Sequence, residues 1–566
     1  MLHGYSRDIH VEATTQIRSQ VQPQACGIEP SMSQDQQSVS SEKCGESTRE
    51  EHSSMKIART YKDAIHALNS LQSNFASIES RKRIGNTLSR NEESINSVFE
   101  FTRRLGYSPA DLNRLNVIHV TGTKGKGSVC SFTNSILKQY SVKNGGPIRK
   151  IGLFTSPHLK HVRERIRING EPIDESLFTK YFFEVWDKLS STTSSPSEFP
   201  DLQPSAEVKP MYFKYLTILS FHVFMSEGVD TAIYEVGVGG TYDSTNIIEK
   251  PTVTAISSLG IDHTFMLGDT IESITWNKTG IFKKGCPAYV SEQPAYPQSI
   301  EVINSRALEL GASSLEIVDT DILPADVQLG LAGDFQRQNA ALAVKISSEH
   351  LSKLGVPSSD LPKFSGSTQL PPKFLAGLRD ARWDGRCQII ENAENFKHIT
   401  WYIDGAHTVE SVKSSSIWFR DTVKRRRQIG REVRVLLFNQ QNRENANSLL
   451  QDLYKSIVDG GINFDHVVFT TNITWSDGNY DPDLVSLNSS SDAVDKMTVQ
   501  KSLAEAWCVM DKEKGRSSRK HIFPDIETGV KFIKSLTNDG SKVDAFVCGS
   551  LHLVGGVLVV LDGKQV

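Results

Sequence analysis

Apolar and polar residues follow two different periods along the chain, and their alternation predicts an α/β fold. Short apolar runs occur at NVIHVTG, KIGLFTS, TAIYEVG and TVTAISSLG, and each ends in small or polar residues. Segments with a helical pattern lie around them, among them YKDAIHALNSL, ESINSVFEFTRRLGY and AGDFQRQNAALAVKISSEHL. Strands that alternate with helices in this way are typical of a parallel sheet with crossover helices.

A second series of strands and helices follows a stretch rich in proline and glycine, residues 357–385. Its expected strands are QIIENA, ITWYIDGAH, VRVLLFN, FDHVVFTT and DAFVCGS. The chain has 566 residues, which is too many for one ordinary core. We therefore expect two domains, residues 55–383 and residues 384–566, after an N-terminal tail of residues 1–54. A polar stretch in the second domain, Ser476–Asp492, is expected to be a surface insertion.

The N-terminal tail differs in composition from the rest of the chain. It is rich in Ser, Gln and Glu and poor in aromatic residues, which is typical of disorder. Its acidic residues, such as Asp8 and Glu12, weaken its resemblance to a mitochondrial presequence. Met55 stands where the ordered pattern begins, and our hypothesis is that it is an alternative start. We expect a cytoplasmic protein, with a mitochondrial form produced by the N-terminal extension.

Composition narrows the classes of partner. The net charge is −3, which gives no general attraction to nucleic acid or to a membrane. Seven cysteines lack C-x-x-C spacing, which argues against a zinc site or a disulfide framework. The most apolar segment, residues 545–561, contains His552 and several glycines, so we interpret it as a buried strand, a turn and an apolar continuation rather than a membrane span.

The strongest chemical signal is the segment TGTKGKGS, residues 121–128. It follows an apolar strand and precedes a helical pattern, which is the context of a phosphate-binding loop. Glycines allow backbone N–H groups to turn onto phosphate oxygens, and a lysine reaches the outer phosphates. Val120 stands where such a loop usually begins with glycine, so a purely structural turn is the alternative. The candidate phosphate ligands are Gly122, Thr123, Lys124, Gly125, Lys126, Gly127 and Ser128.

Further motifs follow this loop in a fixed order. They are FTSPHL from Phe154, RERIRING from Arg163, EVGVGG from Glu235, the pair Asp262-His263, WNKTGI from Trp276, GDFQRQN from Gly333, WDGR from Trp383, DGAH from Asp404 and GSLH from Gly549. In order and spacing these motifs closely resemble the folylpolyglutamate synthases, which are relatives of the Mur peptide ligases. The stretch FNQQ from Phe438 is most similar to fungal members. The resemblance extends from about Tyr61 to the C-terminus.

The resemblance implies a fold and an activity. The fold would be an N-terminal P-loop ATPase domain with a parallel sheet, like the Mur ligase central domain, joined to a smaller C-terminal Rossmann-like domain. The enzyme would use ATP to add L-glutamate to the γ-carboxyl of tetrahydrofolyl-(poly)glutamate through an acyl phosphate, for folate retention and one-carbon metabolism. The expected cofactors are ATP and Mg²⁺, with K⁺ as a further monovalent cation. The substrates would be small molecules, with no nucleic acid, and the protein would be a monomer.

The family pattern also implies roles for single residues. Lys126, Lys278 and His263 would be catalytic, and Lys278 matches the lysine that the family carbamylates. The metal ligands would be Ser156, Glu235 and His263. Beyond the loop, ATP would be contacted by Gln336, Asn339, Arg386 and Asp404. Substrate would be bound by Arg163, Arg165, His407 and Ser550, where the first two belong to a basic run, Lys160–Arg167, suited to a polyglutamate tail.

Each of these roles has a structural alternative. Glu235 could form a surface salt bridge, Lys278 could lie on a helix surface, and His407 could belong only to a turn. Gln336 and Asn339 lie three apart on one helix face and could form a buried capping network. Asp384 replaces a proline that is usual in the family, which leaves the stiffness of the linker open. Two other functions stay open, a dihydrofolate synthase that glutamylates dihydropteroate and a non-catalytic nucleotide-binding protein.

Overall fold

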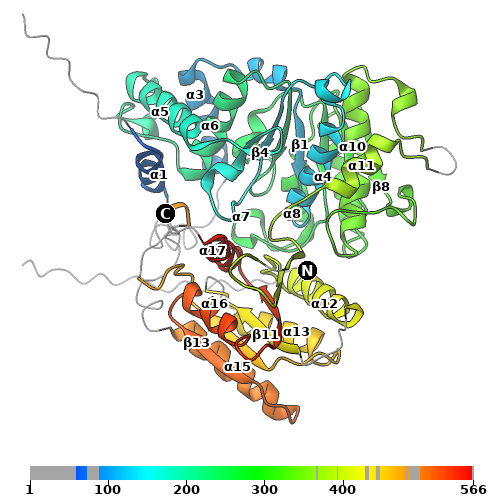
Figure 1. Ribbon diagram of the computed structural model, residues 1–566. Coiled ribbons are helices and arrows are strands. Elements are labelled where there is room, and N and C mark those ends of the chain that lie inside the picture. Colours follow the sequence, from blue (N-terminus) through cyan, green and yellow to red (C-terminus); the bar gives the residue numbers. More distant parts are fainter. Residues whose placement is uncertain are drawn as a thin grey trace, which may run out of the picture. The chain divides into compact units, whose positions relative to one another are not determined.

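The structure, a computed structural model, describes residues 59–72, 88–364, 368–391, 393–426, 432–441, 446–477, 482–484 and 497–563. The predicted tail of residues 1–54 and the alternative start at Met55 lie outside the described residues. In the described chain, two mostly parallel sheets are each packed between helices, as Figure 1 shows. This confirms the α/β class.

The first sheet has β1 (Ile118–Thr121) near its centre. The strand order is β4-β3-β2-β5-β1-β6-β7-β8, and β1 pairs in parallel with β5 (Thr231–Glu235) and β6 (Val253–Ile256). The remaining strands are β2 (Ile151–Phe154), β7 (Pro287–Ser291) and β8 (Ser314–Val318), which are parallel, and β3 (Ile166–Ile168) and β4 (Glu171–Pro172), which are antiparallel. Every residue of β1, β2, β5 and β6 is buried, as expected for strands covered on both faces.

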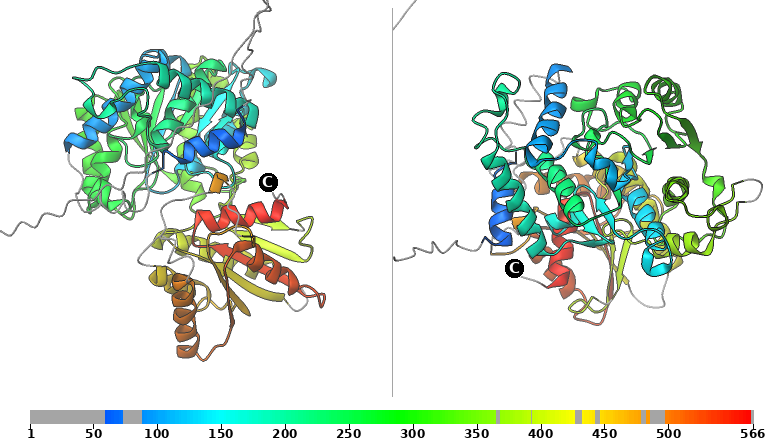
Figure 2. Two further views of the ribbon diagram at one scale, coloured as in Figure 1. Left: turned by 90° about the vertical axis from the view of Figure 1, so that its left-hand side faces the viewer. Right: turned by 90° about the horizontal axis from the view of Figure 1, so that it is seen from above.

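Three buried clusters pack against the first sheet, and two of them contain its longer helices. One contains α4 (Lys126–Lys138), α10 (Gln336–Lys353) and α11 (Pro372–Asp380), and the other contains α1 (Tyr61–Asn69), α3 (Leu88–Leu105), α5 (Glu175–Ser191) and α6 (Tyr212–Ser226). The helices α5 and α6 lie side by side in Figures 1 and 2. Smaller elements are α7 (Thr264–Leu267), α8 (Ile271–Thr279) and α9 (Ser299–Glu309). The helix α11 lies in the stretch rich in proline and glycine, and it begins at a proline, which the first helical position tolerates.

The second sheet has the order β13-β12-β11-β14-β10-β9. Its strands are β9 (Gln388–Glu391), β10 (Ile399–Ile403), β11 (Glu432–Phe438), β12 (His466–Thr470), β13 (Arg519–Phe523) and β14 (Lys542–Cys548), and β9 is antiparallel to β10. Its helices are α12 (Val409–Arg425), α13 (Ala446–Ile457) and α15 (Thr498–Glu513) in one buried cluster, and α16 (Ile526–Ser535) and α17 (Leu551–Asp562) in another.

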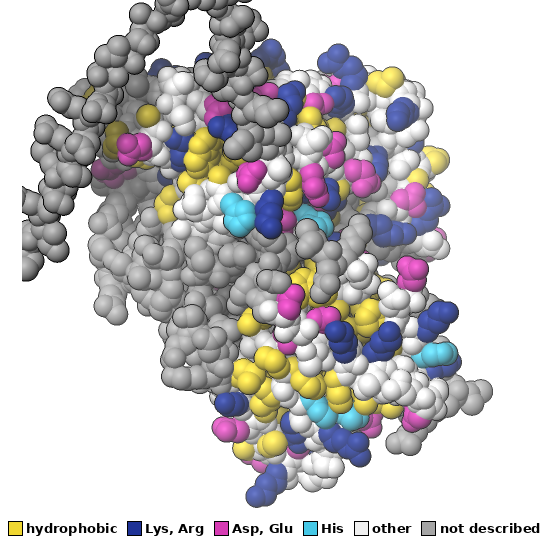
Figure 3. All heavy atoms as spheres, turned by 60° about the vertical axis from the view of Figure 1, so that its left-hand side comes forward, with side chains coloured by type: hydrophobic (Ala, Val, Ile, Leu, Met, Phe, Trp, Pro, Cys, Tyr) yellow, Lys and Arg dark blue, Asp and Glu magenta, His cyan; other side chains and the backbone are white. Residues whose placement is uncertain are grey.

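The most apolar segment of the chain forms the end of β14 and the buried helix α17. None of the described helices has the length and apolar character needed to cross a membrane. Lys and Arg side chains are interspersed with Asp and Glu across the described face that Figure 3 shows. Residues 383–386 lie between α11 and β9, and the domain division placed there stays a prediction.

One predicted surface insertion contains a buried acidic residue. Of the predicted insertion Ser476–Asp492, only residues 476–477 and 482–484 are described. Residues Pro482–Leu484 form a short 3-10 helix, η8, in which the Asp483 side chain is buried, with 7% of the residue exposed. An acidic residue in a polar stretch is normally solvated, so burial at this position requires specific partners.

Candidate active site

Glycine shapes the loop that follows β1. Gly122 has φ +149° and Gly125, directly before α4, has φ +85°, which favours glycine. A Cβ atom at Gly122 would lie 2.0 Å from Ser257 Oγ, and one at Gly125 would lie 2.1 Å from Asn339 Oδ1. The loop therefore needs glycine at both positions, for its backbone conformation and for space.

Residues at the end of β6 fix the loop from the other side. The amides of Thr123 and Lys124 donate to the Ser258 carbonyl over 2.9 and 3.0 Å, and Ser257 Oγ donates to the Lys124 carbonyl over 2.6 Å. The Thr123 hydroxyl donates to the Gly260 carbonyl over 3.1 Å. This hydroxyl is therefore part of the loop's own structure, and the first N–H groups of α4 remain the donors that face outward along the helix axis.

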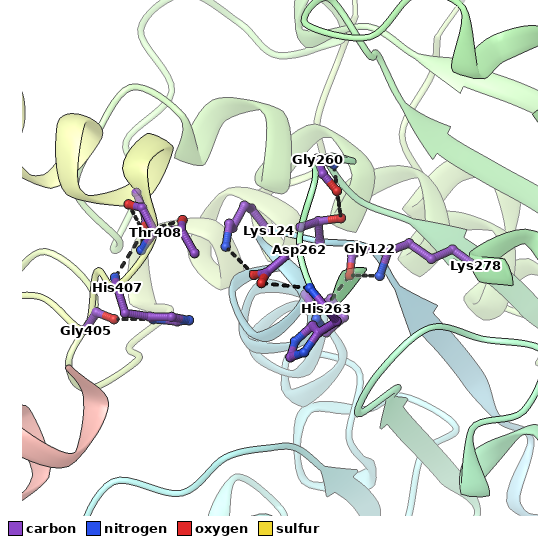
Figure 4. A network of polar contacts seen from close by, with 12 residues as sticks. Gly122, Lys124, Gly260, Asp262, His263, Lys278, Gly405, His407 and Thr408 are labelled. Atoms are coloured by element: carbon purple, nitrogen blue, oxygen red, sulfur yellow. Dashed lines mark hydrogen bonds and ion pairs between the residues drawn. The ribbon is translucent and has the colours of Figure 1, made fainter. Parts of the chain in front are cut away.

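Three lysines gather around this loop, as Figure 4 shows for two of them. Lys126 Nζ and Lys278 Nζ both donate to the Gly122 carbonyl, over 3.1 and 2.8 Å. Lys124 Nζ lies 3.1 Å from Asp262 Oδ2. Lys278 is only 3% exposed, so the alternative of a helix-surface lysine is wrong. Burial lowers the pKa of Lys278 well below its usual range, and the charge of Lys126 lowers it further.

A buried carboxylate stands beside the loop. Glu235, the last residue of β5, is 5% exposed, and its Oε2 accepts the Ser156 amide over 3.1 Å. Burial raises the pKa of Glu235, although Lys126 and the Ser156 hydrogen bond oppose this. A surface salt bridge is therefore excluded for Glu235. The structure brings together two of the three predicted metal ligands.

The third predicted metal ligand, His263, lies at the start of α7. It is exposed, has φ +53°, and its amide donates to Asp262 Oδ1 over 3.0 Å. The described residues contain no group of three or more His, Cys, Asp or Glu side chains arranged to hold a metal ion. Oxygen ligands from Glu235 and Ser156 nevertheless suit Mg²⁺, which proteins often hold through one or two side chains together with substrate phosphates.

The pair on α10 contacts the phosphate loop directly. Asn339 Nδ2 donates to Gln336 Oε1 over 2.9 Å, and Gln336 Nε2 donates to Ser128 Oγ over 3.2 Å. Both side chains are buried. The structure therefore shows a buried network, and that network ends on the loop, so the structural and nucleotide-binding interpretations are not alternatives here.

Candidate residues at the carboxyl edge of the second sheet form hydrogen bonds with nearby backbone groups. The Asp404 carboxylate accepts the amides of Cys387 and Ala406 over 2.7 and 2.9 Å, and burial raises its pKa while Arg386 opposes that rise. His407 Nδ1 lies 2.9 Å from the Gly405 carbonyl, as Figure 4 shows. Ser550 caps α17. The charge of the half-buried Arg386 also lowers the pKa of Glu235. This arginine therefore acts on two carboxylates, Glu235 at the end of β5 and Asp404 directly after β10.

The basic run Lys160–Arg167 is more tightly paired than we expected. Lys160 Nζ binds Asp562 Oδ2 of α17 over 2.8 Å, and Arg163 Nη1 donates to the Ile173 carbonyl over 3.3 Å. Arg165 is buried, and its Nε donates to His158 Nδ1 over 2.9 Å. The interpretation of the run as a solvated basic strand is therefore wrong.

Two features of the site escaped the sequence analysis. Asp243 accepts the amides of Gly237 and Val238, both over 3.1 Å, and so holds the glycine turn after Glu235. Its spacing from Glu235 in a glycine-rich stretch is the only signal. A pocket of about 520 Å³ is lined by Asn91, Tyr242, Thr264, Phe265, Met266, Leu267, Gly268, Ser273, Trp276 and Asn277. Its aromatic residues have no periodicity that would reveal a pocket.

Comparison with known proteins identifies the family. A family profile described as "Dihydrofolate synthetase, C-terminal domain" matches residues 387–560. A Candida albicans protein named folylpolyglutamate synthase is 60% identical over 517 residues, which are 90% of this chain and 97% of the relative. The chain belongs to the folylpolyglutamate synthase family. The resemblance that the motifs carried is thereby confirmed.

Solved folylpolyglutamate synthase structures share the fold. The Mycobacterium tuberculosis folylpolyglutamate synthase complexed with ADP has a TM-score of 0.61 at 19% identity, over 89% of this chain and 99% of that one. A bifunctional folylpolyglutamate synthase/dihydrofolate synthase from Yersinia pestis, complexed with AMPPNP and a Mn ion, has a TM-score of 0.57 at 22% identity, over 83% and 93%. These likenesses confirm the expected two-part fold.

Proposed function

We propose that the protein uses ATP to add L-glutamate to the γ-carboxyl of a reduced folylpolyglutamate. The observation that carries this proposal is the group formed by the glycine loop, Lys126, Lys278 and Glu235 at the carboxyl edge of one parallel sheet. Ligands bind at this edge of open α/β sheets. The family to which the chain belongs supplies the reaction.

The chemistry explains why ATP and this geometry are needed together. A carboxylate is a poor electrophile, because its oxygen is a poor leaving group. Transfer of the γ-phosphoryl group of ATP to the folate carboxylate gives an acyl phosphate, and the neutral amine of glutamate attacks its carbonyl carbon and expels phosphate. Negative charge shifts among phosphate oxygens in the first step, and positioned cations and N–H groups stabilise it.

The N-terminus of α4 and Lys126 would bind the phosphates. The helix supplies N–H groups and the positive end of its dipole, and Lys126 adds a charge that can leave the Gly122 carbonyl for a phosphate oxygen. Gln336 and Asn339 would hold Ser128 and Gly125 in register from α10. Arg386 would contact phosphate, Asp404 the nucleotide, and His407 and Ser550 the incoming glutamate.

A divalent cation fits beside Glu235. The carboxylate is buried and its pKa is raised, so it lacks full compensation for its charge in the folded chain. Glu235 and Ser156 would hold Mg²⁺ with the phosphates, and the ion would neutralise the charge that develops on them. A second ion held by His263 and a K⁺ ion are further parts of this proposal, which omission of each cation from the assay tests.

Lys278 is suited to carbamylation. Because burial and Lys126 favour the neutral amine, its lone pair is available to attack carbon dioxide, giving a carbamate and releasing a proton. The product is an anion, and it would lie among Lys124 and Lys126 where a cation is disfavoured. Mass spectrometry and ¹³C NMR after incubation with ¹³C-bicarbonate test this, and a spectrum without a carbamate signal in active enzyme contradicts it.

The folate ring would occupy the pocket of about 520 Å³ whose lining includes Tyr242, Phe265 and Trp276. Phe265 and Trp276 are 53% and 39% exposed there, although such side chains are usually covered. A flat aromatic ring would cover them and remove apolar surface from water. Trp276→Ala is then expected to raise the KM for folate more than the KM for ATP.

Dihydrofolate synthase activity is the second candidate. It is supported by the family profile, whose description names dihydrofolate synthetase. The discriminating experiment supplies ATP, Mg²⁺ and labelled glutamate with either tetrahydrofolate or dihydropteroate and identifies the products. We expect glutamylated tetrahydrofolate. Product from dihydropteroate alone would reverse the substrate assignment, and ADP binding without either product would favour a non-catalytic nucleotide-binding protein.

A further inference from the structure

The short helix η8 brings an acidic side chain against α1 and against the segment that follows β2. Asp483 Oδ1 accepts the Tyr61 hydroxyl of α1 over 2.7 Å and the Val162 amide over 2.6 Å. Asp483 Oδ2 lies 4.0 Å from His161 Nδ1. One buried residue of the C-terminal part of the chain thus joins two segments that lie more than 300 positions before it.

The electrostatics show that Asp483 is an anion in this place. Burial alone would raise its pKa, but the nearby His161 and hydrogen bonds from Tyr61 and the Val162 amide outweigh burial and lower it. The pKa of His161 is raised, first by its interaction with Asp483. A buried carboxylate with several donors is costly to remove, because its partners would lose their acceptor together.

A chain of hydrogen bonds leads from η8 to Arg165, whose charge acts on Glu235. The Asp483 carbonyl lies 2.7 Å from His158 Nε2, and His158 Nδ1 accepts Arg165 Nε over 2.9 Å. Burial lowers the pKa of His158 to about 3, so the ring is neutral and its Nε2 carries the proton that is donated to Asp483. The charge of Arg165 in turn lowers the pKa of Glu235.

Apolar packing fixes the same loop to α17. Leu484 packs against a buried cluster that includes Leu159, Leu553 and Val554. The Leu159 carbonyl comes so close to α17 that a Cβ atom at Gly555 would lie 2.1 Å from its oxygen. The loop from Ser156 to Arg165 is therefore held at its polar groups by Asp483 and at its apolar side by Leu484 and α17.

We propose that Asp483 is a positioning residue for the ligation reaction, whose carboxylate holds the Ser156–Arg165 loop so that Ser156 stays beside Glu235. This inference rests on the proposed function, because that function supplies the ligation reaction. The direct effect of Asp483 is on the site expected to hold Mg²⁺, although Asp483 itself does not touch that site.

The test measures ADP binding by calorimetry at a series of Mg²⁺ concentrations, together with the steady-state rate of ligation. Asp483→Asn keeps the size of the side chain and an oxygen that can still accept Tyr61 and Val162, but it removes the charge and turns the oxygen that faces His161 into a donor. We expect the Mg²⁺ concentration for half-maximal ADP binding to rise about tenfold, the usual effect of losing a partner that orients a metal ligand. The kcat at low Mg²⁺ should fall similarly and recover at high Mg²⁺.

Asp562→Asn is the matched control. It removes the 2.8 Å ion pair with Lys160 in the same loop, but Asp562 lies on the exposed end of α17. We expect its Mg²⁺ dependence to equal that of the wild type. Tyr61→Phe removes a single donor to Asp483 and should shift the Mg²⁺ dependence in the same direction by a smaller factor, which gives a result even where Asp483→Asn does not fold.

The outcomes separate the two proposals. An unshifted Mg²⁺ dependence in folded Asp483→Asn, or in Tyr61→Phe where the first variant does not fold, overturns the positioning role. An equal shift in the Asp562→Asn control overturns it as well, since any weakening of the loop would then suffice. A wild type that binds ADP with Mg²⁺ but ligates no glutamate would contradict the proposed function while leaving the binding test of Asp483 intact.

Discussion

The carboxyl edges of the two sheets differ in how far the folded chain satisfies their polar side chains. At the first sheet, Lys278 and Glu235 are buried with pKa values shifted against their charged forms. At the second sheet, Asp404 accepts two backbone amides and Ser550 caps α17. Burial also raises the pKa of Asp404, but Asp404 accepts two backbone amides where Glu235 accepts one, so the second edge uses more of its polar groups to hold turns.

This difference indicates where binding energy is available. A buried charge without full compensation costs free energy of folding, and a ligand of opposite charge can return that cost on binding. A side chain that already satisfies backbone amides has little more to gain from a ligand. Substitutions at the first edge should therefore affect activity more than stability, and substitutions at the second edge should affect both.

The largest effect is expected for Lys126→Met. The substitution keeps the length of the side chain but removes the charge that we assign to the phosphates, so kcat should fall by about 10³-fold. The melting temperature should change little, because Lys126 makes one hydrogen bond to the Gly122 carbonyl. Steady-state kinetics and thermal unfolding measure the two quantities. Lys143→Met, at an exposed lysine, is the control, and near-normal turnover of Lys126→Met would contradict the phosphate role.

Glu235→Gln should separate activity from stability. Because burial raises the pKa of Glu235, an uncharged amide is easier to bury at pH 7.5, and the variant should melt at a higher temperature than the wild type. Its activity should nevertheless fall by about 10²-fold, since the carboxylate is the expected metal ligand.

Glu227→Gln is the matched control for Glu235→Gln. A hydrogen bond from Lys150 lowers the pKa of Glu227, so the loss of charge there should lower the melting temperature and leave activity unchanged. Opposite signs of the two shifts in melting temperature are the result to look for. A destabilised Glu235→Gln would show that the carboxylate contributes to folding as those of the second edge do.

Gly125→Ala should have an intermediate effect. The new methyl group would lie 2.1 Å from Asn339 Oδ1, and φ is +85°. Displacing Asn339 disturbs the loop, so we expect the KM for ATP to rise about tenfold, a cost of about 1.4 kcal/mol. Gly145→Ala is a close control, because its φ is +74° but no atom lies within 4 Å of the new methyl group. Equal effects of the two substitutions on the KM would reject crowding of Asn339 as the cause.

The sequence predicted the elements of both sheets well, because their signals are local. The buried strands β1, β2, β5 and β6 are short apolar runs, and the glycine loop has a fixed spacing. The helix α11 escaped because its prolines indicate a break, although one of them stands where a helix tolerates proline. Local pattern also placed Glu235, since a residue that ends a parallel strand lies at the sheet's carboxyl edge.

Long-range pairing explains what the sequence could not predict. The burial of Asp483 depends on Tyr61 and Val162, which lie far away in the sequence, and a polar stretch gives no sign of either. The basic run that contains Arg165 resembles a solvated strand until His158 is placed against it. Burial of polar groups is decided by partners, and a single sequence does not show which residues meet.

The smallest effect is expected at the second edge, for Asp404→Asn. The Cys387 and Ala406 amides donate to different oxygens of Asp404, and Asn has only one acceptor oxygen, so one of the two hydrogen bonds is lost at a cost of about 1 kcal/mol. The KM for ATP should change only severalfold, because the remaining hydrogen bond preserves the turn after β10.

The stability lost in Asp404→Asn should depend on pH, and the direction of that dependence follows from the pKa of Asp404. Burial raises the folded pKa of Asp404 above its unfolded value of 3.8, so the stability that this carboxyl contributes is fully present below that pH and is lost as the pH rises through the folded pKa. An amide does not titrate, so the deficit of the variant should be smaller at pH 8 than at pH 4, which urea unfolding at both pH values would measure. A deficit that grows with pH would contradict the raised pKa of Asp404, because it would mean that the folded chain favours the Asp404 anion.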